Sequence, residues 1–404
     1  MEQKTLVNQQ QGKSNLNTAF LLMQSIGIIA VVLGHADYGG DDIPNVFNLA
    51  FPYYSWHMPF FVFISGYFFN RTRPAGKYIL QKLKTHLLPA FMVNLACGVF
   101  SACILAYGVT DYGMDITFES LFITPFTTGY QFNINIALWY IFALVIIEII
   151  AVLMDRLVRG KGDLVYLAVT LFVSLYCCCL CYYDHEGTRD EYLNALLRLG
   201  FLMFFFWLGV CYKRYFEKPL KRFINFKLSI VIFTAQILFL GFTEYVIRIN
   251  TRDMNLTHIT VPDGYWVAVV SPLTATLFIM GICYSVAPYL ANSKFLATFG
   301  RSTKYVVYYH QLIFVLSSIL CAVLVKKELL VINGFNFEKM SQKIYYSGGN
   351  LYLTVAVVVA SIVLPVVICR FVDKQKLLVK IAMYLGLGAG VVWFLYGAGF
   401  VLNA

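Results

Sequence analysis

The chain has 404 residues, of which 59% are hydrophobic and only 13% are charged, and its mean hydropathy is +0.70. Soluble domains carry about 25% charged residues, so the composition disfavours a soluble all-α protein and makes the lipid bilayer the expected solvent. Long apolar segments favour helices over a transmembrane barrel, whose segments would be short and alternating. We therefore expect an all-α, polytopic integral membrane protein.

The net charge is +10, which in a soluble protein would suggest nucleic acid as a partner. In a membrane protein, Lys and Arg gather on the cytosolic side and explain such a charge, so no nucleic-acid partner is expected. The ten cysteines lie mostly in apolar runs. Buried cysteine packs as a small hydrophobe, and we interpret this group as packing rather than as a metal or redox site.

A spanning helix needs about 20 apolar residues. Residues 1–17 are polar and are expected to form a disordered cytosolic tail, not a signal peptide. Eleven candidate spans follow, of which the second is the shortest: 18–36, 56–70, 87–108, 135–154, 164–183, 192–212, 228–248, 265–287, 304–325, 350–369 and 379–401.

Most of the 31 Lys and Arg residues lie in every second connection, including 71–86 and 213–227. The loops 37–55 and 109–134 contain neither residue type. The positive-inside rule places the first set in the cytosol, which puts the N-terminus inside and, with eleven spans, the C-terminus outside. No loop is long enough for a soluble domain, so the function is expected within the membrane or at its two faces.

Polar side chains inside the spans are costly and mark functional positions. Sorted by depth, they form two layers. The outer layer holds His35, His57, Arg198, Glu244 and Arg248, and the inner layer holds Gln24, Glu148 and His310. His35 and Gln24 are eleven residues apart, so they share one face of the first helix, about 16 Å apart in depth.

Two histidines stand on either side of an acidic outer loop, His35 at the end of the first span and His57 at the start of the second. A histidine, with an ordinary pKa of about 6.5, suits a general base at neutral pH. We predict that His35 is this base, with His57 and Asp37 as further catalytic residues. Its orienting partner stays open among His57, Asp37, Asp41 and Asp42.

Substrate contacts are expected from the other outer polar groups. Arg198 is expected either to bind an anionic or polyol substrate or to pair with Glu244 across helices. Glu244 and Arg248 are four residues apart, which suits a local ion pair as well as a substrate contact. Trp56 is a candidate stacking face for a sugar, although aromatic residues in membrane proteins also serve interfaces and packing.

Basic residues gather on the predicted inner face. Attraction to anionic lipid and the topology signal explain many of them. The alternative is a docking site for a cytosolic polyanion, in which arginine is the better clamp for phosphate. The clusters are Arg71, Arg73, Lys77, Lys82, Lys84 and His86; Lys213, Arg214, Lys218, Lys221, Arg222 and Lys227; and Arg301 with Lys304.

Six motifs, in order over about residues 20–315, resemble the membrane-bound acyltransferase family 3, closest to its fucose-4-O-acetylase-like branch. The second is the most specific. They are LGH at 33–35, HMPFFVFISGYF at 57–68, KLKTHLLP at 82–89, LWY at 138–140, FFFWLG at 204–209 and GRSTKYVVYYH at 300–310.

The resemblance implies a ten-helix acyltransferase domain, here 18–376, with 377–404 as an additional C-terminal transmembrane helix. It implies transfer of an acyl group, usually acetyl, from cytosolic acyl-CoA to a hydroxyl of a glycan or other acceptor at the outer face. Acetyl-CoA would be a co-substrate and no cofactor would be bound permanently. The donor-binding candidates are Gln24, Arg71, Arg73, Lys82, Lys84 and Arg301. Gln24 departs from the basic residue that relatives often carry there.

The expected mechanism takes the proton of the acceptor hydroxyl onto His35, either directly before attack on the thioester or with an acyl-histidine intermediate. Acetyl, succinyl or longer chains and several glycan acceptors stay open. The expected location is the cell (inner or plasma) membrane, crossed many times, with membrane lipids as neighbours. The competing classes are an exporter of a glycan or lipid-linked precursor and, last, a structural or sensory protein; the absence of a visible internal repeat disfavours the exporter weakly.

Overall fold

The computed structural model describes most of the chain. The described residues are 2–38, 41–42, 50–106, 108, 114–129, 131–157, 162–183, 190–242, 267–333, 335–343, 345–372 and the single positions 375, 379, 383, 386 and 390. For residues 2–16, 37–38, 41–42 and 369–370 only the backbone is described. The additional helix expected over 377–404 therefore lies almost wholly outside the described residues and stays a prediction.

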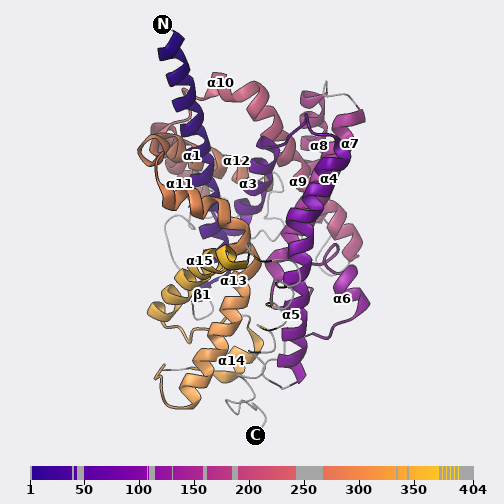
Figure 1. The fold of residues 1–404 in the computed structure, drawn as a ribbon, viewed down its shortest axis with the longest axis vertical. Coiled ribbons are helices and arrows are strands. Elements are labelled where there is room, and N and C mark those ends of the chain that lie inside the picture. The colour runs from indigo at the N-terminus through magenta and orange to yellow at the C-terminus, as the bar shows by residue number, and fades with distance from the viewer. Residues whose placement is uncertain are drawn as a thin grey trace. The chain divides into compact units, whose positions relative to one another are not determined.

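The described chain is built almost entirely of helices (Figure 1). The exception is a two-residue antiparallel pair that pairs Asp37 with Asp42 and Tyr38 with Asp41. In chain order the elements are α1 (Glu2–His35), β1 (Asp37–Tyr38), β2 (Asp41–Asp42), α3 (Tyr53–Tyr67), α4 (Ala75–Lys82), the π-helical turn η1 (Leu83–Leu87), α5 (Leu88–Ala106), α6 (Phe118–Phe122), the 3-10 turn η2 (Ile136–Leu138), α7 (Trp139–Leu157), α8 (Asp163–Tyr183), α9 (Glu191–Cys211), the π-helical turn η3 (Tyr212–Phe216), α10 (Glu217–Leu220), α11 (Phe226–Gly241), α12 (Val267–Leu290), α13 (Lys294–Lys326), α14 (Phe337–Gln342) and α15 (Leu351–Val372).

Eight helices among the described residues are long and apolar enough to cross a membrane. They coincide with eight of the eleven candidate spans. The candidate 56–70 corresponds to α3, which has 15 residues, and the candidate 228–248 to α11, which has 16 described residues. The chain is thus an all-α polytopic membrane protein, as its composition predicts.

Three helices begin earlier than the apolar pattern predicts. α1 begins at Glu2 rather than near residue 18, because Glu, Gln and Lys favour helix without being apolar. α4 and η1 continue into α5, so Lys77, Lys82 and Lys84 lie on helix and not in a loop. α13 begins at Lys294, where the Ser293 hydroxyl accepts the Leu296 N–H at 3.2 Å as a cap.

The chain divides into two compact units. Unit 1 comprises 1–31, 45–75 and 147–303, and unit 2 comprises 32–44, 76–146 and 304–404. Within unit 1, α3 packs against α9 and α9 packs against α8. Glycines permit the first contact: a Cβ on Gly66 would lie 2.0 Å from the Phe206 carbonyl oxygen, and one on Gly209 would lie 2.1 Å from that of Phe63. Small residues allow such close backbone approach between membrane helices.

Unit 2 contains a buried segment without regular structure, residues 131–135, immediately before η2. Asn133 adopts a left-handed conformation there, with φ 56°. Buried backbone without regular structure requires polar partners inside the protein. Asn94 of α5 donates to the Gln131 side chain, and the Ser101 hydroxyl donates to the Phe132 carbonyl at 2.9 Å. These bonds fix the entry to α7.

Candidate active site

Unit 2 brings two histidines together at the end of α1. The rings of His35 and His310 have centroids 5.4 Å apart and planes tilted by 36°. His35, the last residue of α1, is half-buried, whereas His310 is completely buried. The His310 Nδ1–H donates to the Val306 carbonyl one turn earlier, at 2.7 Å, because that oxygen can only accept. The half-buried imidazole of His35, the predicted base, therefore lies beside a fully buried imidazole.

The prediction that His35 and His310 lie in different layers is wrong, because their ring centroids are 5.4 Å apart. The apolar pattern put the start of the His310 helix at residue 304, which would leave His310 near the cytosolic end. α13 in fact spans Lys294–Lys326, so His310 lies at its midpoint. The helix extends because polar Arg301 and Lys304 are good helix formers even though they interrupt the apolar run.

The stretch of α13 around His310 is held by the segment before α7. The Asn135 amide donates to the Tyr308 carbonyl at 2.9 Å, and the Ala137 N–H donates to the Gln311 side chain at 2.7 Å. The Phe314 ring meets the His310 ring edge-on, with centroids 5.9 Å apart. Within unit 2, the helix backbone next to His310 is therefore held by the segment before α7, and its ring packs against Phe314.

His57 is buried in α3 and belongs to unit 1, whereas His35 belongs to unit 2. Its Nδ1–H donates to the Tyr53 carbonyl of the same helix. The neighbouring Trp56 is also fully buried, and its indole N–H donates to the Phe51 carbonyl at 3.2 Å. Both side chains thus bond to backbone of their own segment, and their catalytic and substrate roles stay predictions.

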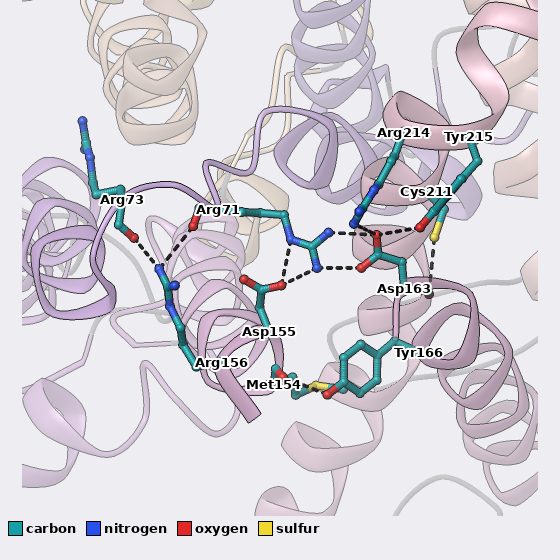
Figure 2. A network of polar contacts seen from close by, with 10 residues as sticks. All are labelled: Arg71, Arg73, Met154, Asp155, Arg156, Asp163, Tyr166, Cys211, Arg214 and Tyr215. Atoms are coloured by element: carbon teal, nitrogen blue, oxygen red, sulfur yellow. Dashed lines mark hydrogen bonds and ion pairs between the residues drawn. The ribbon is translucent and has the colours of Figure 1, made fainter. Parts of the chain in front are cut away.

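Figure 2 shows a charge cluster in unit 1 around Arg71, which lies between α3 and α4. Its guanidinium donates to Asp155 at the end of α7 through Nε at 2.7 Å and also through Nη2. It donates to Asp163 at the start of α8 through Nη1 at 2.8 Å and Nη2 at 2.6 Å. Burial alone would lower the pKa of Arg71, but the hydrogen bonds to Asp163 and Asp155 outweigh it and raise the pKa above its ordinary value.

Asp163 is the centre of this cluster. Its side chain is 0% exposed, whereas that of Arg71 is 21% and that of Arg214 is 50% exposed. Arg214, in η3, donates to Asp163 at 2.7 Å, and the Tyr215 hydroxyl donates to the same carboxylate at 3.4 Å (Figure 2). One buried carboxylate therefore receives hydrogen bonds from two arginines, which offsets the cost of burying its charge.

The same region fixes the backbone around Arg73. Arg156 donates through Nη2 to the carbonyls of Arg71 at 3.2 Å and Arg73 at 2.7 Å. The Arg73 side chain is half-exposed and carries no ion pair shown in Figure 2. Of the neighbouring donor candidates Arg71 and Arg73, Arg71 is therefore the one that is paired with carboxylates of the chain itself.

The remaining donor candidates are spread over several helices. Gln24 is half-buried in α1, on the same continuous helix as His35. Lys82 ends α4 with its ammonium 5.4 Å from the Tyr78 ring centroid. Lys84 and Arg301 are exposed, in η1 and α13 respectively. These two present the most accessible charges of the six candidates.

One family model, described as an acyltransferase domain, matches residues 17–370. The chain belongs to the acyltransferase 3 family. It is therefore a multi-pass membrane acyltransferase, which decides against the exporter. No curated protein and no solved structure matches the chain.

Three predicted site residues of the acyltransferase lie outside what the structure describes. Glu244 and Arg248 fall beyond the described end of α11, and the Asp37 side chain is not described although its backbone forms β1. Arg198 is described and almost completely buried in α9. Their substrate and catalytic roles stay predictions.

The geometry brings forward two residues of the acyltransferase that the sequence did not single out, Asp155 and Asp163. Asp155 and Asp163 were not considered because each looks like an ordinary acidic residue at the edge of a loop. Their position on either side of the predicted cytosolic connection 155–162, on the same face as Arg71, was the available signal. His310 was noticed, but its contact with His35 required the true start of α13.

Proposed function

We propose that this acyltransferase is an acyl-CoA-dependent O-acetyltransferase of the cell membrane. It moves an acetyl group from cytosolic acetyl-CoA to a hydroxyl of a glycan or cell-surface polysaccharide at the outer face. The observation that supports this most is the half-buried His35 at the end of α1, next to His310, in a chain of the acyltransferase 3 family. An imidazole in that position has the chemistry required to activate a hydroxyl.

His35 acts as the general base in this proposal. It takes the proton from the acceptor hydroxyl while the hydroxyl oxygen attacks the thioester carbonyl carbon. The C–S bond then breaks, the CoA thiolate leaves, and the proton on His35 passes to that thiolate. The products are an acetyl ester and CoA with a free thiol, so His35 ends the cycle as it began.

The donor is proposed to dock through its phosphates on cytosolic basic side chains. Lys84 and Arg301 suit this role because they are exposed. Further candidates are Arg73, Lys82 and Gln24. Arg71 can bind a donor phosphate only with those N–H groups that do not donate to Asp155 and Asp163. The acceptor is proposed to meet His35, with Arg198 and Trp56 as candidate contacts.

The test uses the full chain purified in detergent and supplied with acetyl-CoA labelled in its acetyl group. The wild type is expected to release free CoA thiol and, with an acceptor glycan, to form labelled ester. His35→Ala is expected to lower this turnover by at least about a hundredfold, in line with loss of a general base. Full activity of H35A would overturn the proposal.

The same assay separates the open variants. Label that stays on the denatured wild-type protein and is absent from H35A indicates an acyl-histidine intermediate, whereas direct transfer leaves the protein unlabelled. Competition by unlabelled succinyl-CoA against acetyl-CoA measures which acyl group the enzyme prefers. A preference for succinyl-CoA would support acyl transfer from acyl-CoA but contradict acetyl as the transferred group.

A further inference from the structure

The turn between α3 and α4 carries two arginines, Arg71 and Arg73, on either side of Thr72. Its shape is partly fixed by its own residues. The Asn70 side-chain oxygen accepts the Thr72 N–H at 3.1 Å and the Thr72 hydroxyl at 2.8 Å, a bond pattern that stabilises short turns. Pro74 follows and favours an extended backbone at Arg73. The local sequence therefore leaves this turn few conformations.

The end of α7 holds the backbone of the same turn. Arg156 donates through Nη2 to the Arg71 carbonyl at 3.2 Å and to the Arg73 carbonyl at 2.7 Å. Both carbonyls lie outside the helices, where backbone oxygens need donors from elsewhere. One guanidinium nitrogen thus bridges two peptide planes of the turn. Because both planes are held, the direction in which the Arg73 side chain leaves the backbone is held as well.

The two arginines of the turn point in different directions. The Arg71 guanidinium forms ion pairs with Asp155 and Asp163, whose charges balance its own. Figure 2 shows the Arg73 side chain pointing away from these carboxylates. Among the residues that the structure describes, no carboxylate forms an ion pair with Arg73, which is half-exposed. Arg73 is therefore the one of the two whose charge can meet an anion from outside the chain.

We propose that Arg156 is the positioning residue of Arg73. By holding the carbonyls of Arg71 and Arg73, it fixes the direction in which the Arg73 guanidinium meets a phosphate of the acyl-CoA donor. A planar guanidinium that is already held in place loses less freedom when it binds phosphate. Arg71 then anchors the turn on its carboxylates and is not a donor contact. This inference rests on the proposed function, because Arg73 needs a phosphorylated donor on the cytosolic side.

A double-mutant cycle on the full chain in detergent tests the proposal, with KM and kcat measured for acetyl-CoA. Arg73→Ala is expected to raise KM about three- to tenfold with kcat nearly unchanged. Arg156→Ala is expected to raise KM about two- to fivefold, again with kcat and Tm nearly unchanged. In the double variant, KM is expected to match that of R73A within about 1.5-fold, because Arg156 acts only through Arg73.

Three outcomes of this cycle overturn the proposal. The first is an R156A variant with the wild-type KM. The second is an R156A change that raises KM by the same factor with and without Arg73, because Arg156 would then bind the donor itself. The third is a loss of Tm and kcat in R156A without a rise in KM, which marks a purely structural role. If R156A cannot be recovered folded, Arg156→Gln enters the same cycle under the same criteria.

Two further variants separate the hydrogen bonds from the charge. Arg156→Lys keeps N–H donors at the end of a long side chain and is expected to stay within about twofold of the wild-type KM. An R156K variant as weak as R156A contradicts the proposal. Lys294→Ala is the matched control, because Lys294 is an exposed cation at the start of α13, on the predicted cytosolic side. A rise in KM in K294A equal to that in R156A assigns the effect to net surface charge and overturns the proposal.

The failure of this inference differs from the failure of the proposed function. If the wild type does not turn over acetyl-CoA, or if H35A is fully active, the proposed function falls. If H35A is inactive and both R73A and R156A keep the wild-type KM, only the roles of Arg73 and Arg156 fall.

Discussion

Gly66 of α3 touches the backbone of Phe206 in α9: a Cβ at position 66 would lie 2.0 Å from the Phe206 carbonyl oxygen. Gly209 of α9 makes the reciprocal approach to the Phe63 carbonyl of α3. Lipid solvates apolar side chains as well as a protein interior does, so close packing and not burial alone holds such helices together. The second motif of the family resemblance, residues 57–68, therefore includes a packing glycine.

Gly66→Ala is expected to destabilise the protein by about 2 kcal/mol, because the helices must separate to admit the methyl group. The measurement is Tm in detergent together with the yield of monodisperse protein. Gly76→Ala is the matched control, since nothing lies within 4 Å of a Cβ there and the residue is exposed in α4. Equal Tm values for G66A and G76A would contradict the packing account.

Asp163→Asn is expected to destabilise the protein by about 3 kcal/mol, because it leaves Arg71 and Arg214 without the buried charge that they share. Thermal unfolding in detergent measures the loss. Asp190→Asn is the control, as Asp190 is exposed before α9 and its side chain caps no backbone N–H. The cluster would be energetically unimportant if D163N melted like D190N.

Lys84→Ala and Arg301→Ala are each expected to raise the KM for acetyl-CoA about three- to tenfold with kcat nearly unchanged. Losing one charge contact to a phosphate costs on the order of 1 kcal/mol, and every 1.4 kcal/mol is tenfold in affinity. The KM values should also rise with salt concentration in the wild type. Lys339→Ala is the control, because Lys339 is exposed in α14, on the predicted outer side. An unchanged KM in both variants would move the donor site elsewhere.

The predicted orientation is tested with single added cysteines at two exposed lysines. Lys77→Cys in α4 is expected to react with a membrane-impermeant maleimide only after the cells are permeabilised. Lys339→Cys in α14 is expected to react in intact cells. The opposite pattern would invert the topology and remove the cytosolic docking face for the donor.

Particular residues show where prediction from sequence succeeds. The helical, membrane-spanning class follows from composition and segment length, because the bilayer accepts only long apolar helices or closed barrels. The choice of His35 as the base rests on an ionisable group at the end of a span and on the LGH and HMPFFVFISGYF motifs around it, and it stays a prediction. The family assignment made from these motifs is confirmed over residues 17–370.

Helix ends and contacts between distant segments were beyond the sequence. Hydropathy detects apolar runs but not helical turns made of polar residues. The sequence therefore placed the starts of two helices too late: the continuous helix that begins with α4, and α13, which carries His310. Arg71 pairs with Asp155 and Asp163, which are more than 80 residues away. A contact between residues so far apart in the chain leaves no local sequence pattern.

The sequence by itself determined that this protein is a membrane acyltransferase, and it made His35 the predicted base. Both depend on local properties, namely hydropathy and short motifs. Only the tertiary structure decided that His310 lies beside His35 and that Arg71 forms salt bridges with Asp155 and Asp163. Those partners are set by where helices far apart in the chain come together, which depends on packing along their whole length and not on the residues near either partner.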